Sequence, residues 1–311
     1  MAAMSGGTHY DLSVVISTHA RPRELRQAIE AVRAQDHPGP IETLVVWDKA
    51  EIEPELAVDP ADDPHRPVRL LHNDRTPGLP GSRNCGAAAA SASVLGFCDD
   101  DDLWLPQRAR RQLAVLEDTG ADVASSGQEI EIDGRVVPRV GATDLLRFRD
   151  LLRSRRIEAN MVTSIVRADA FWGSIGPLDE HLPGGFAEDY EWMLRAARHQ
   201  PIPVVPEPLA RIRWTAPSHF RDQWALWEAA LPVVLDRNPE FAGEPTGRAR
   251  IEGQLAVAVA AQGRRREAVR RARRTLAWSW REPRAFIALA VAAGVPIEPI
   301  AAALNRRGRG I

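Results

Sequence analysis

The sequence has few of the features that mark exported or membrane-embedded proteins. Its 311 residues include only two cysteines, Cys85 and Cys98, which are too few for a disulfide framework and are typical of a reducing compartment. The chain does not open with a basic segment and a long apolar run, so we expect no signal peptide. The longest apolar stretch, residues 285–304, is interrupted by two prolines and a glutamate and is a poor membrane span. These features predict a cytoplasmic protein.

Lysine is nearly absent, and the positive charge is unevenly distributed. Lys49 is the only lysine, so 39 of the 40 basic residues are arginines, a bias that a GC-rich genome also produces. The formal net charge of −2 excludes a strongly basic nucleic-acid binder, and we expect no nucleic-acid partner. Residues 246–311, however, contain 14 arginines and 4 glutamates, which gives +10, whereas the rest of the chain has 26 basic and 38 acidic residues, which gives −12.

The remaining composition, with 44% apolar and 26% charged residues, is that of a folded protein. Short runs rich in β-branched residues alternate with segments whose apolar residues recur at helical spacing. We predict strands at 12–17, 41–47, 68–71 and 94–98, and helices at 23–34, 82–92 and 106–116. This alternation predicts an α/β fold with a mainly parallel sheet flanked by helices.

The pattern changes near residue 218. The segments 223–235, 248–262, 264–280 and 283–293 have the spacing of consecutive helices. They predict a C-terminal all-α appendage rather than a solenoid, because one helical hairpin is too short for a repeat array. We therefore predict two domains, an α/β domain over residues 10–217 and an Arg-rich helical domain over residues 218–311.

Polar side chains stand at the ends of three of the expected strands, where ligands bind in sheets of this kind. Ser17 and Thr18 end the first strand, Asp48 follows the second, and the run Asp99–Asp102 follows the fourth. Adjacent carboxylates repel one another unless a cation or solvent relieves them. Ligands that offer only oxygen favour Mg²⁺ or Mn²⁺, although acidic residues also occur in solvated loops and at helix starts.

In their order and spacing, five segments resemble those of family 2 glycosyltransferases of the GT-A fold. They are LSVVISTHARP, AVRAQDHPGPIETLVVWD, NDRTPGLPGSRNCGAAAA, LGFCDDDDLWLP and FAEDYEWMLRA, and they lie within roughly residues 10–215. The resemblance implies a GT-A nucleotide-diphospho-sugar transferase fold and an inverting transfer of a sugar to an acceptor hydroxyl. It also implies Mn²⁺ or Mg²⁺ as cofactor and a UDP-, dTDP- or GDP-sugar as donor.

The resemblance places the nucleotide base at the ends of the first two strands. A carboxylate only accepts hydrogen bonds, so Asp48 would select a base that presents an N–H, such as uracil, thymine or guanine. The family usually has two acids at this point, whereas this chain has Trp47 before Asp48. Ser17 and Thr18 would add contacts to the base. The alternatives are a turn role for Asp48 and helix capping for the two hydroxyls.

Five further residues are candidates on the donor side. The resemblance places Arg83 and Asn84 near the nucleotide or its diphosphate, with pairing of Arg83 to nearby acids as the alternative. It implies that Asp99 and Asp100 bind the nucleotide sugar. Two overlapping D-x-D patterns leave the register of the acidic run open by one residue, and we expect Asp101, with Asp99, to bind the metal.

Glu188 and Asp189 precede a segment of helical spacing. By the resemblance they are the catalytic residues, with Asp189 as the general base that removes the proton from the attacking hydroxyl. One carboxylate is enough, because a metal-bound diphosphate leaves without being protonated, unlike the leaving group in hydrolysis by paired carboxylates. The alternative is an acidic helix start with no catalytic role.

The acceptor is the least defined part of the expected reaction. Trp192 and Trp214 could stack on an acceptor sugar, although tryptophans are more often part of the core. The acceptor could be a carbohydrate, a lipid-linked molecule or a small molecule. The chain has no clear Q-x-x-R-W motif of processive synthases, so we expect a single transfer rather than polymerisation.

Two other functions stay open at this point. A nucleotidyltransferase on a related α/β fold would also use clustered aspartates, but it needs a basic phosphate loop near the first strand, and ISTHARPRE is not glycine-rich. A non-catalytic module that binds a sugar nucleotide would not need Asp189.

The arginines of residues 264–274 are by default a solvated helix face. They could instead place the protein at the inner face of an anionic membrane, or dock on the acidic domain or a second subunit.

Overall fold

A computed structural model describes residues 9–19, 21–132, 134–156, 158–214 and 223–306. The chain forms two compact units. The first comprises residues 1–148, 156–180 and 188–216, and the second comprises residues 149–155, 181–187 and 217–311. The second unit therefore takes in two short segments that come from the middle of the chain, in addition to the C-terminal helices.

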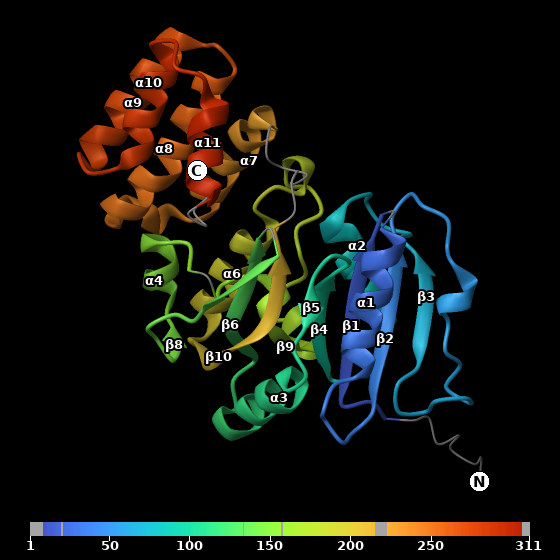
Figure 1. Cartoon of the computed structure of the whole chain (residues 1–311). Coiled ribbons are helices and arrows are strands. Elements are labelled where there is room, and N and C mark those ends of the chain that lie inside the picture. The colour runs from blue at the N-terminus through green and yellow to red at the C-terminus, as the bar shows by residue number, and fades with distance from the viewer. Residues whose placement is uncertain (1–8, 20, 133, 157, 215–222, 307–311) are drawn as a thin grey trace. The chain divides into compact units, whose positions relative to one another are not determined.

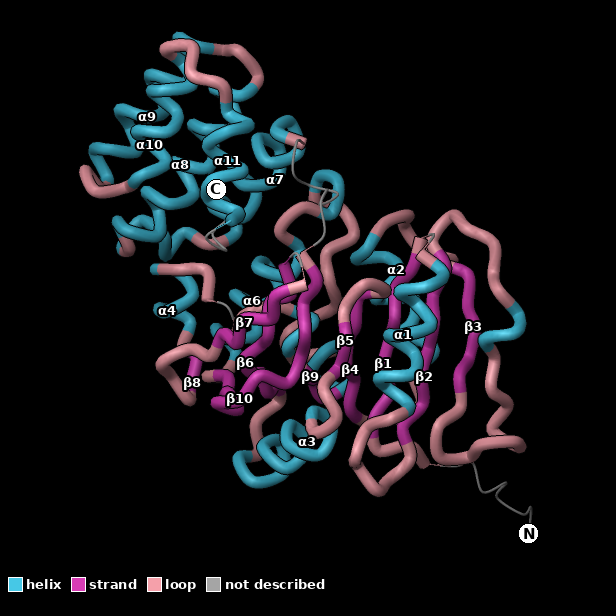
Figure 2. The backbone as a smooth tube through the Cα atoms, in the orientation of Figure 1, coloured by secondary structure: helices cyan, strands magenta, loops and turns pink. Residues whose placement is uncertain are grey.

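A ten-stranded sheet is the centre of the first unit (Figures 1 and 2). Its strands are β1 (Leu12–Thr18), β2 (Ile41–Trp47), β3 (Val68–His72), β4 (Val94–Asp99), β5 (Leu103–Trp104), β6 (Val123–Ile132), β7 (Arg135–Arg139), β8 (Leu145–Leu146), β9 (Ile165–Arg167) and β10 (Ile202–Arg213). The order along the sheet is β3-β2-β1-β4-β9-β6-β10-β5, with β7 paired to β6 and β8 paired to β10.

The sheet is mixed rather than mainly parallel. The pairs β1–β2, β2–β3, β1–β4 and β6–β10 are parallel, and the other five pairs are antiparallel. The α/β class is confirmed, and the half of the sheet that the sequence predicts, β3-β2-β1-β4, is the parallel half. The antiparallel strands come from residues 103–213, where we predicted no strand.

Helices lie along the chain between these strands. They are α1 (Pro22–Arg33), α2 (Leu79–Ala89), α3 (Arg108–Thr119), α4 (Phe148–Arg153), α5 (Ala168–Trp172) and α6 (Glu188–His199), and short 3₁₀ turns cover Pro54–Leu56, Met161–Thr163, Pro183–Gly185 and Pro239–Gly243. The expected elements up to residue 119 are all present, with ends that differ by three residues or fewer.

Helices cover both faces of β1 and β2, which explains why every residue of these strands is buried. Leu25 and Ile29 of α1 pack on the face that carries Val14 and Ile16. On the other face, a Cβ added to Gly86 of α2 would come within 2.4 Å of a Val15 methyl carbon. Glycine at this position therefore lets α2 lie directly against the sheet.

The carboxyl ends of β1, β2 and β4 lie at one level, which we call the carboxyl edge. In the parallel register Ser17 is paired with Asp99, and Thr18 is paired with Trp47. The residues that follow these strands therefore leave the sheet side by side, as binding residues do in open α/β sheets.

The second unit is built around one buried helix. Its helices are α7 (Trp224–Arg237), α8 (Pro245–Ala261), α9 (Arg265–Trp278), α10 (Pro283–Ala292) and α11 (Ile297–Arg306). Small residues of α8, α9 and α10 form its core, including Ala256, Ala268, Ala272 and Ala288. Four of these helices were predicted and α11 was not. No helix among the described residues is both long and apolar enough to cross a membrane.

Candidate active site at the carboxyl edge

The four aspartates form a tight turn whose side chains are held by different elements. The Asp102 amide donates to the Asp99 carbonyl at 3.1 Å, which closes the turn. Asp102 itself points toward β10, where its Oδ1 accepts the backbone N–H of Arg213 at 3.0 Å. Asp100 accepts the Thr18 hydroxyl at 2.8 Å. The position of the acidic run is thus fixed by β1 on one side and β10 on the other.

Arg21, which we did not predict as a site residue from the sequence, pairs with two aspartates of the acidic run. Its Nη1 donates to Asp100 Oδ1 at 2.9 Å and also to Asp101. Even so, burial and the neighbouring Asp99 raise the pKa of Asp101 to about 6. Arg21 therefore offsets only part of the repulsion within the run, which retains an excess of negative charge. In the sequence, only its position shortly after the first strand could have indicated that Arg21 lies at the site.

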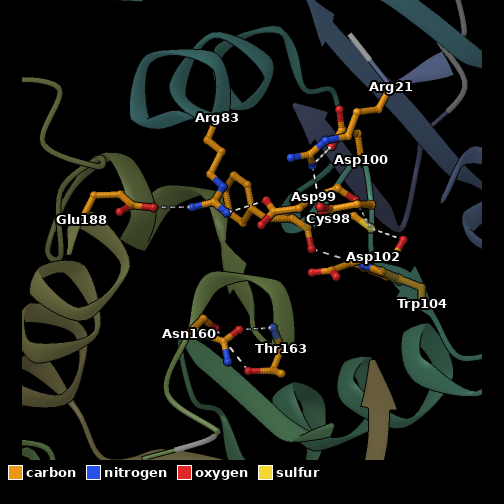
Figure 3. A network of polar contacts seen from close by, with 12 residues as sticks. Arg21, Arg83, Cys98, Asp99, Asp100, Asp102, Trp104, Asn160, Thr163 and Glu188 are labelled. Atoms are coloured by element: carbon orange, nitrogen blue, oxygen red, sulfur yellow. Dashed lines mark hydrogen bonds and ion pairs between the residues drawn. The ribbon is translucent and has the colours of Figure 1, made fainter. Parts of the chain in front are cut away.

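Arg83 joins the acidic run to the start of α6 (Figure 3). The residue is 2% exposed, its Nη2 donates to Asp99 Oδ1 at 2.6 Å, and its Nη1 donates to Glu188 Oε1 at 2.9 Å. Both guanidinium ends are thus used by acids of the protein, which was the alternative to contact with the nucleotide. We call this arrangement the Arg83 bridge.

Glu188 and Asp189 occupy the first turn of α6 in different environments. Ala187, directly before them, has a φ of +64°, a left-handed conformation that is strained for alanine. Glu188 is 5% exposed, and burial together with Asp189 raises its pKa to about 7. Asp189 is partly exposed, and its Oδ1 accepts the N–H of Tyr190 at 2.7 Å. Of the two, Asp189 is the carboxylate that an incoming molecule can reach.

Asp48 organises the loop that leads into α2. Its Oδ1 accepts from the Asn73 amide at 2.9 Å, and its Oδ2 accepts the Gly78 N–H at 3.0 Å. Each carboxylate oxygen has a further lone pair, so a base N–H can still bind here. The next residue, Lys49, is exposed and has a φ of +55°. Asp48 thus has the turn role that was the alternative, and keeps acceptor capacity.

Ser17 has an unused hydroxyl at the same edge. The residue is 7% exposed, and its Oγ has no hydrogen-bond partner among the described residues. A buried polar atom without a partner carries a desolvation penalty, which a ligand group can remove. Thr18, by contrast, already donates to Asp100.

The Asn84 side chain is buried and makes its hydrogen bonds within the protein. Its Oδ1 accepts the N–H of Leu178, and its Nδ2 donates to the Leu178 carbonyl and to Glu180 at 2.8 Å. With both Nδ2 hydrogens donated and only 1% of the residue exposed, Asn84 ties α2 to residues 178–180. These contacts support a positioning role for Asn84, and its nucleotide contact stays a prediction.

The two tryptophans expected on the acceptor side differ in exposure. Trp192 is 0% exposed, packs against Phe171 and donates from Nε1 to the Gly176 carbonyl, so it belongs to the core and cannot stack on a sugar. Trp214 follows β10, is 36% exposed, and has the Arg139 guanidinium carbon 5.8 Å from its ring centroid. Trp214 stays a candidate for the acceptor side.

The acidic run offers oxygen atoms of the kind that Mg²⁺ or Mn²⁺, the ions implied by the resemblance, prefer as ligands. Among the described residues no group of three or more His, Cys, Asp or Glu side chains is placed to hold a metal ion. Asp99 and Asp101 have side chains that are 29% and 22% exposed, and they belong to a run with excess negative charge. Two carboxylates leave most positions of Mg²⁺ or Mn²⁺ for substrate oxygens and water, as these ions prefer.

Comparison with known proteins finds a glycosyltransferase family and proteins of polysaccharide biosynthesis. The model of the family described as "Glycosyl transferase family 2" matches residues 13–165. The succinoglycan biosynthesis protein ExoO of Rhizobium meliloti (strain 1021) is 30% identical over 172 residues, which cover 55% of this chain and 47% of ExoO. The amylovoran biosynthesis glycosyltransferase AmsE of Erwinia amylovora is 26% identical over 206 residues, which cover 65% of this chain and 75% of AmsE. The chain thus spans about half the length of ExoO.

A solved structure has the same fold. The crystal structure of S. aureus TarS 1-349 in complex with UDP-GlcNAc aligns with a TM-score of 0.59 at 14% identity, over 96% of this chain and 92% of that chain. At this identity the likeness concerns the fold alone. The matched family segment contains β1 from Ser13 onward, all of β2 and β4, and the acidic run. The family resemblance is confirmed, because residues 13–165 match the model of the family 2 glycosyltransferases. The fifth segment, at residues 186–196, lies beyond that match.

Proposed function

We propose that the protein transfers one sugar from a nucleotide-diphosphate sugar to an acceptor hydroxyl, with inversion at the anomeric carbon. The observation that carries this proposal is the Arg83 bridge, in which one buried guanidinium contacts both Asp99 and Glu188. In a single displacement the leaving group and the base act on opposite sides of one carbon atom, so donor-side and acceptor-side groups must be held close together. The bridge provides that proximity.

The donor is a sugar nucleotide whose base binds at the ends of β1 and β2. Asp48 has acceptor capacity for a base N–H, and the buried Ser17 hydroxyl lacks a partner among the described residues. These groups suit uracil, thymine or guanine. The UDP-GlcNAc complex of TarS supports a UDP-sugar as the first donor to test.

The diphosphate and the ion belong at the acidic run. Asp99 and Asp101 would hold Mn²⁺ or Mg²⁺. Asp100, the residue between them in the sequence, accepts hydrogen bonds from Thr18 and Arg21. Such an ion, when bound, offsets the negative charge that develops on the diphosphate as the sugar departs. The excess negative charge of the run supports this assignment.

Asp189 is the proposed base because Glu188 is buried and held by Arg83. The Asp189 carboxylate removes the proton of the acceptor hydroxyl, and the hydroxyl oxygen forms a bond to the anomeric carbon. The bond from that carbon to the diphosphate oxygen breaks at the same time, and its electron pair leaves with the nucleoside diphosphate. The proton on Asp189 then passes to solvent.

The substitution Asp189→Asn tests the base, and the chain offers a matched control. Asp169 accepts the N–H of Ala170 at 2.8 Å in the first turn of α5, as Asp189 does for Tyr190 in α6. We expect Asp189→Asn to lower transfer by roughly 10²–10⁴-fold with nucleotide affinity nearly unchanged, and Asp169→Asn to leave transfer intact. Sugar transfer would be followed by mass spectrometry of the acceptor, and nucleotide binding by calorimetry.

Three outcomes, the last from an assay with a nucleoside triphosphate, would contradict the proposal. Transfer by Asp189→Asn at the wild-type rate would show that the base is another residue. A wild-type protein that binds sugar nucleotides without transferring sugar would favour a binding module. Release of pyrophosphate from a nucleoside triphosphate would favour a nucleotidyltransferase.

A further inference from the structure

The outer side of α9 presents three arginines in line. Ala268, Ala272 and Thr275 of this helix are 0% exposed and face the core of the second unit. Residues spaced by three or four positions share one side of a helix, so Arg266, Arg270 and Arg273 form a stripe opposite that buried seam. All three are exposed. We call them the arginine face.

The charge of the arginine face is not compensated within the described residues. Other arginines of this unit have acidic partners: Arg264 pairs with Glu228 and Glu267, Arg271 pairs with Glu267, Arg248 and Arg274 pair with Glu252, and Arg284 pairs with Glu282. Within the described part of the chain, no carboxylate lies within ion-pair distance of the arginine face. The nearby acids are thus engaged elsewhere, and the stripe keeps its full positive charge.

A large aromatic side chain directly follows this helix. Trp280 lies in the turn after α9, is 70% exposed, and has the Arg281 guanidinium carbon 4.7 Å from its ring centroid. Phe286 of α10 is also exposed, at 54%. Exposed aromatic rings beside cations are typical of residues that sit at the boundary between lipid headgroups and acyl chains.

We propose that the arginine face and Trp280 dock on a membrane surface that carries anionic headgroups. A bilayer offers diffuse negative charge for three aligned guanidinium groups, and a boundary layer where an amphipathic indole ring is stable. A line of unpaired cations on α9, followed two residues after the helix by an exposed indole, is complementary to both. This inference goes beyond the proposed function, because it concerns where the protein acts and not what it transfers.

Vesicle co-sedimentation of the full chain tests the proposal. The vesicles would contain phosphatidylcholine alone, or phosphatidylcholine with about one third phosphatidylglycerol. We expect the protein to sediment only with the anionic vesicles, and binding to fall as salt is raised. The variant Arg266→Gln/Arg270→Gln/Arg273→Gln should bind roughly tenfold or more weakly. Trp280→Ala should also weaken binding, although it changes no charge.

A second triple variant separates the face from net charge. Arg264→Gln/Arg271→Gln/Arg284→Gln removes the same charge from the same unit, but from arginines that have acidic partners. We expect it to bind vesicles nearly as well as the wild type, provided that circular dichroism shows both variants folded. If both triple variants lost vesicle binding equally, binding would depend on net charge alone and the proposal would be overturned.

Other partners of the arginine face are outcomes of the same experiment. Equal recovery with neutral and anionic vesicles would overturn the proposal. Two further results would overturn it if the protein does not bind vesicles. One is self-association in sedimentation velocity that the arginine-face variant abolishes. The other is binding to an oligonucleotide that the same variant abolishes. Transfer to a soluble acceptor should be unchanged in this variant, so failure of vesicle binding and failure of the proposed function are distinguishable.

Discussion

A guanidinium that is 2% exposed and shared by two carboxylates has few acceptable replacements. Removal of Arg83 would leave Asp99 and Glu188 with uncompensated charge, which is far more costly than loss of a surface ion pair. Lysine would keep the charge, but its single ammonium lacks the planar fork that lets Arg83 reach both acids. The Arg83 bridge therefore ties the stability of the fold and the proposed sugar transfer to one side chain.

For Arg83→Met we expect the free energy of unfolding to fall by about 3–5 kcal/mol, because a buried ion pair loses one partner. Arg83→Lys should be more stable than Arg83→Met, and should lower kcat more than it changes KM for the donor. Urea unfolding and steady-state kinetics would measure these effects. An Arg83→Met protein as stable as the wild type would show that the bridge does not support the fold.

The raised pKa of Glu188 predicts a pH dependence of stability. Its usual value of 4.5 rises to about 7 through burial and the proximity of Asp189. The folded state thus binds more protons between these values, so the wild-type unfolding free energy should lose this contribution as pH rises from about 4.5 to 7. Glu188→Gln lacks this titration. Unfolding of both proteins from pH 5 to 8, without added metal, would check the difference, and parallel curves would contradict it.

At the scale of elements, the sequence was most informative where burial was purely apolar. The runs that became β1 and β2 are rich in β-branched residues and were located within one residue at each end. β6 was missed because its buried positions include Ser125 and Ser126, which break the apolar pattern. β10 was missed because its three prolines are typical of a loop, and it accommodates two of them at register shifts.

In the candidate site, too, only the residues marked by a local sequence pattern could be predicted. Asp48, Asp99 and Asp189 could be found because each stands next to a recognisable strand end or helix start. The partners of the site could not, since they arise from tertiary contact: Arg83 and Glu188 are 105 positions apart in the chain. Charge and local spacing contain no information about such a pair.

The close approach of α2 to the sheet gives a test of the element that carries Arg83. Gly86→Ala would place a Cβ within 2.4 Å of a Val15 methyl carbon, and overpacking of a filled interior destabilises by about 1–3 kcal/mol. Gly243→Ala is the control, because no atom lies within 4 Å of its added Cβ. We expect a lower melting temperature only for Gly86→Ala. Equal melting temperatures would show that α2 can shift without penalty.

At the scale of the whole molecule, the second unit is not simply a C-terminal tail. It includes residues 149–155 and 181–187, and Phe186 stacks on Trp227 of α7 with ring centroids 5.0 Å apart. Phe186 lies two positions before Glu188, so part of the helical unit directly precedes the proposed catalytic residues. The chain is therefore divided by contacts at places that differ from the single boundary near residue 217.

A chain shortened to residues 1–216 should reveal this arrangement. It would lose α7 to α11 and leave Phe186 without its stacking partner, so we expect greater binding of a hydrophobic dye and aggregation in gel filtration. Sugar transfer should fall because the segment before Glu188 loses its support. A shortened chain that is monomeric and fully active would contradict the prediction.

The left-handed residue after Asp48 has a practical consequence. Lys49 is exposed at the carboxyl edge and carries the only ε-amine of the chain. An amine-reactive dye would therefore mark one side chain beside the proposed nucleotide site, apart from the chain terminus. The native protein could then report donor binding by fluorescence without any engineered residue, whereas coupling to a surface through amines would obstruct that same site.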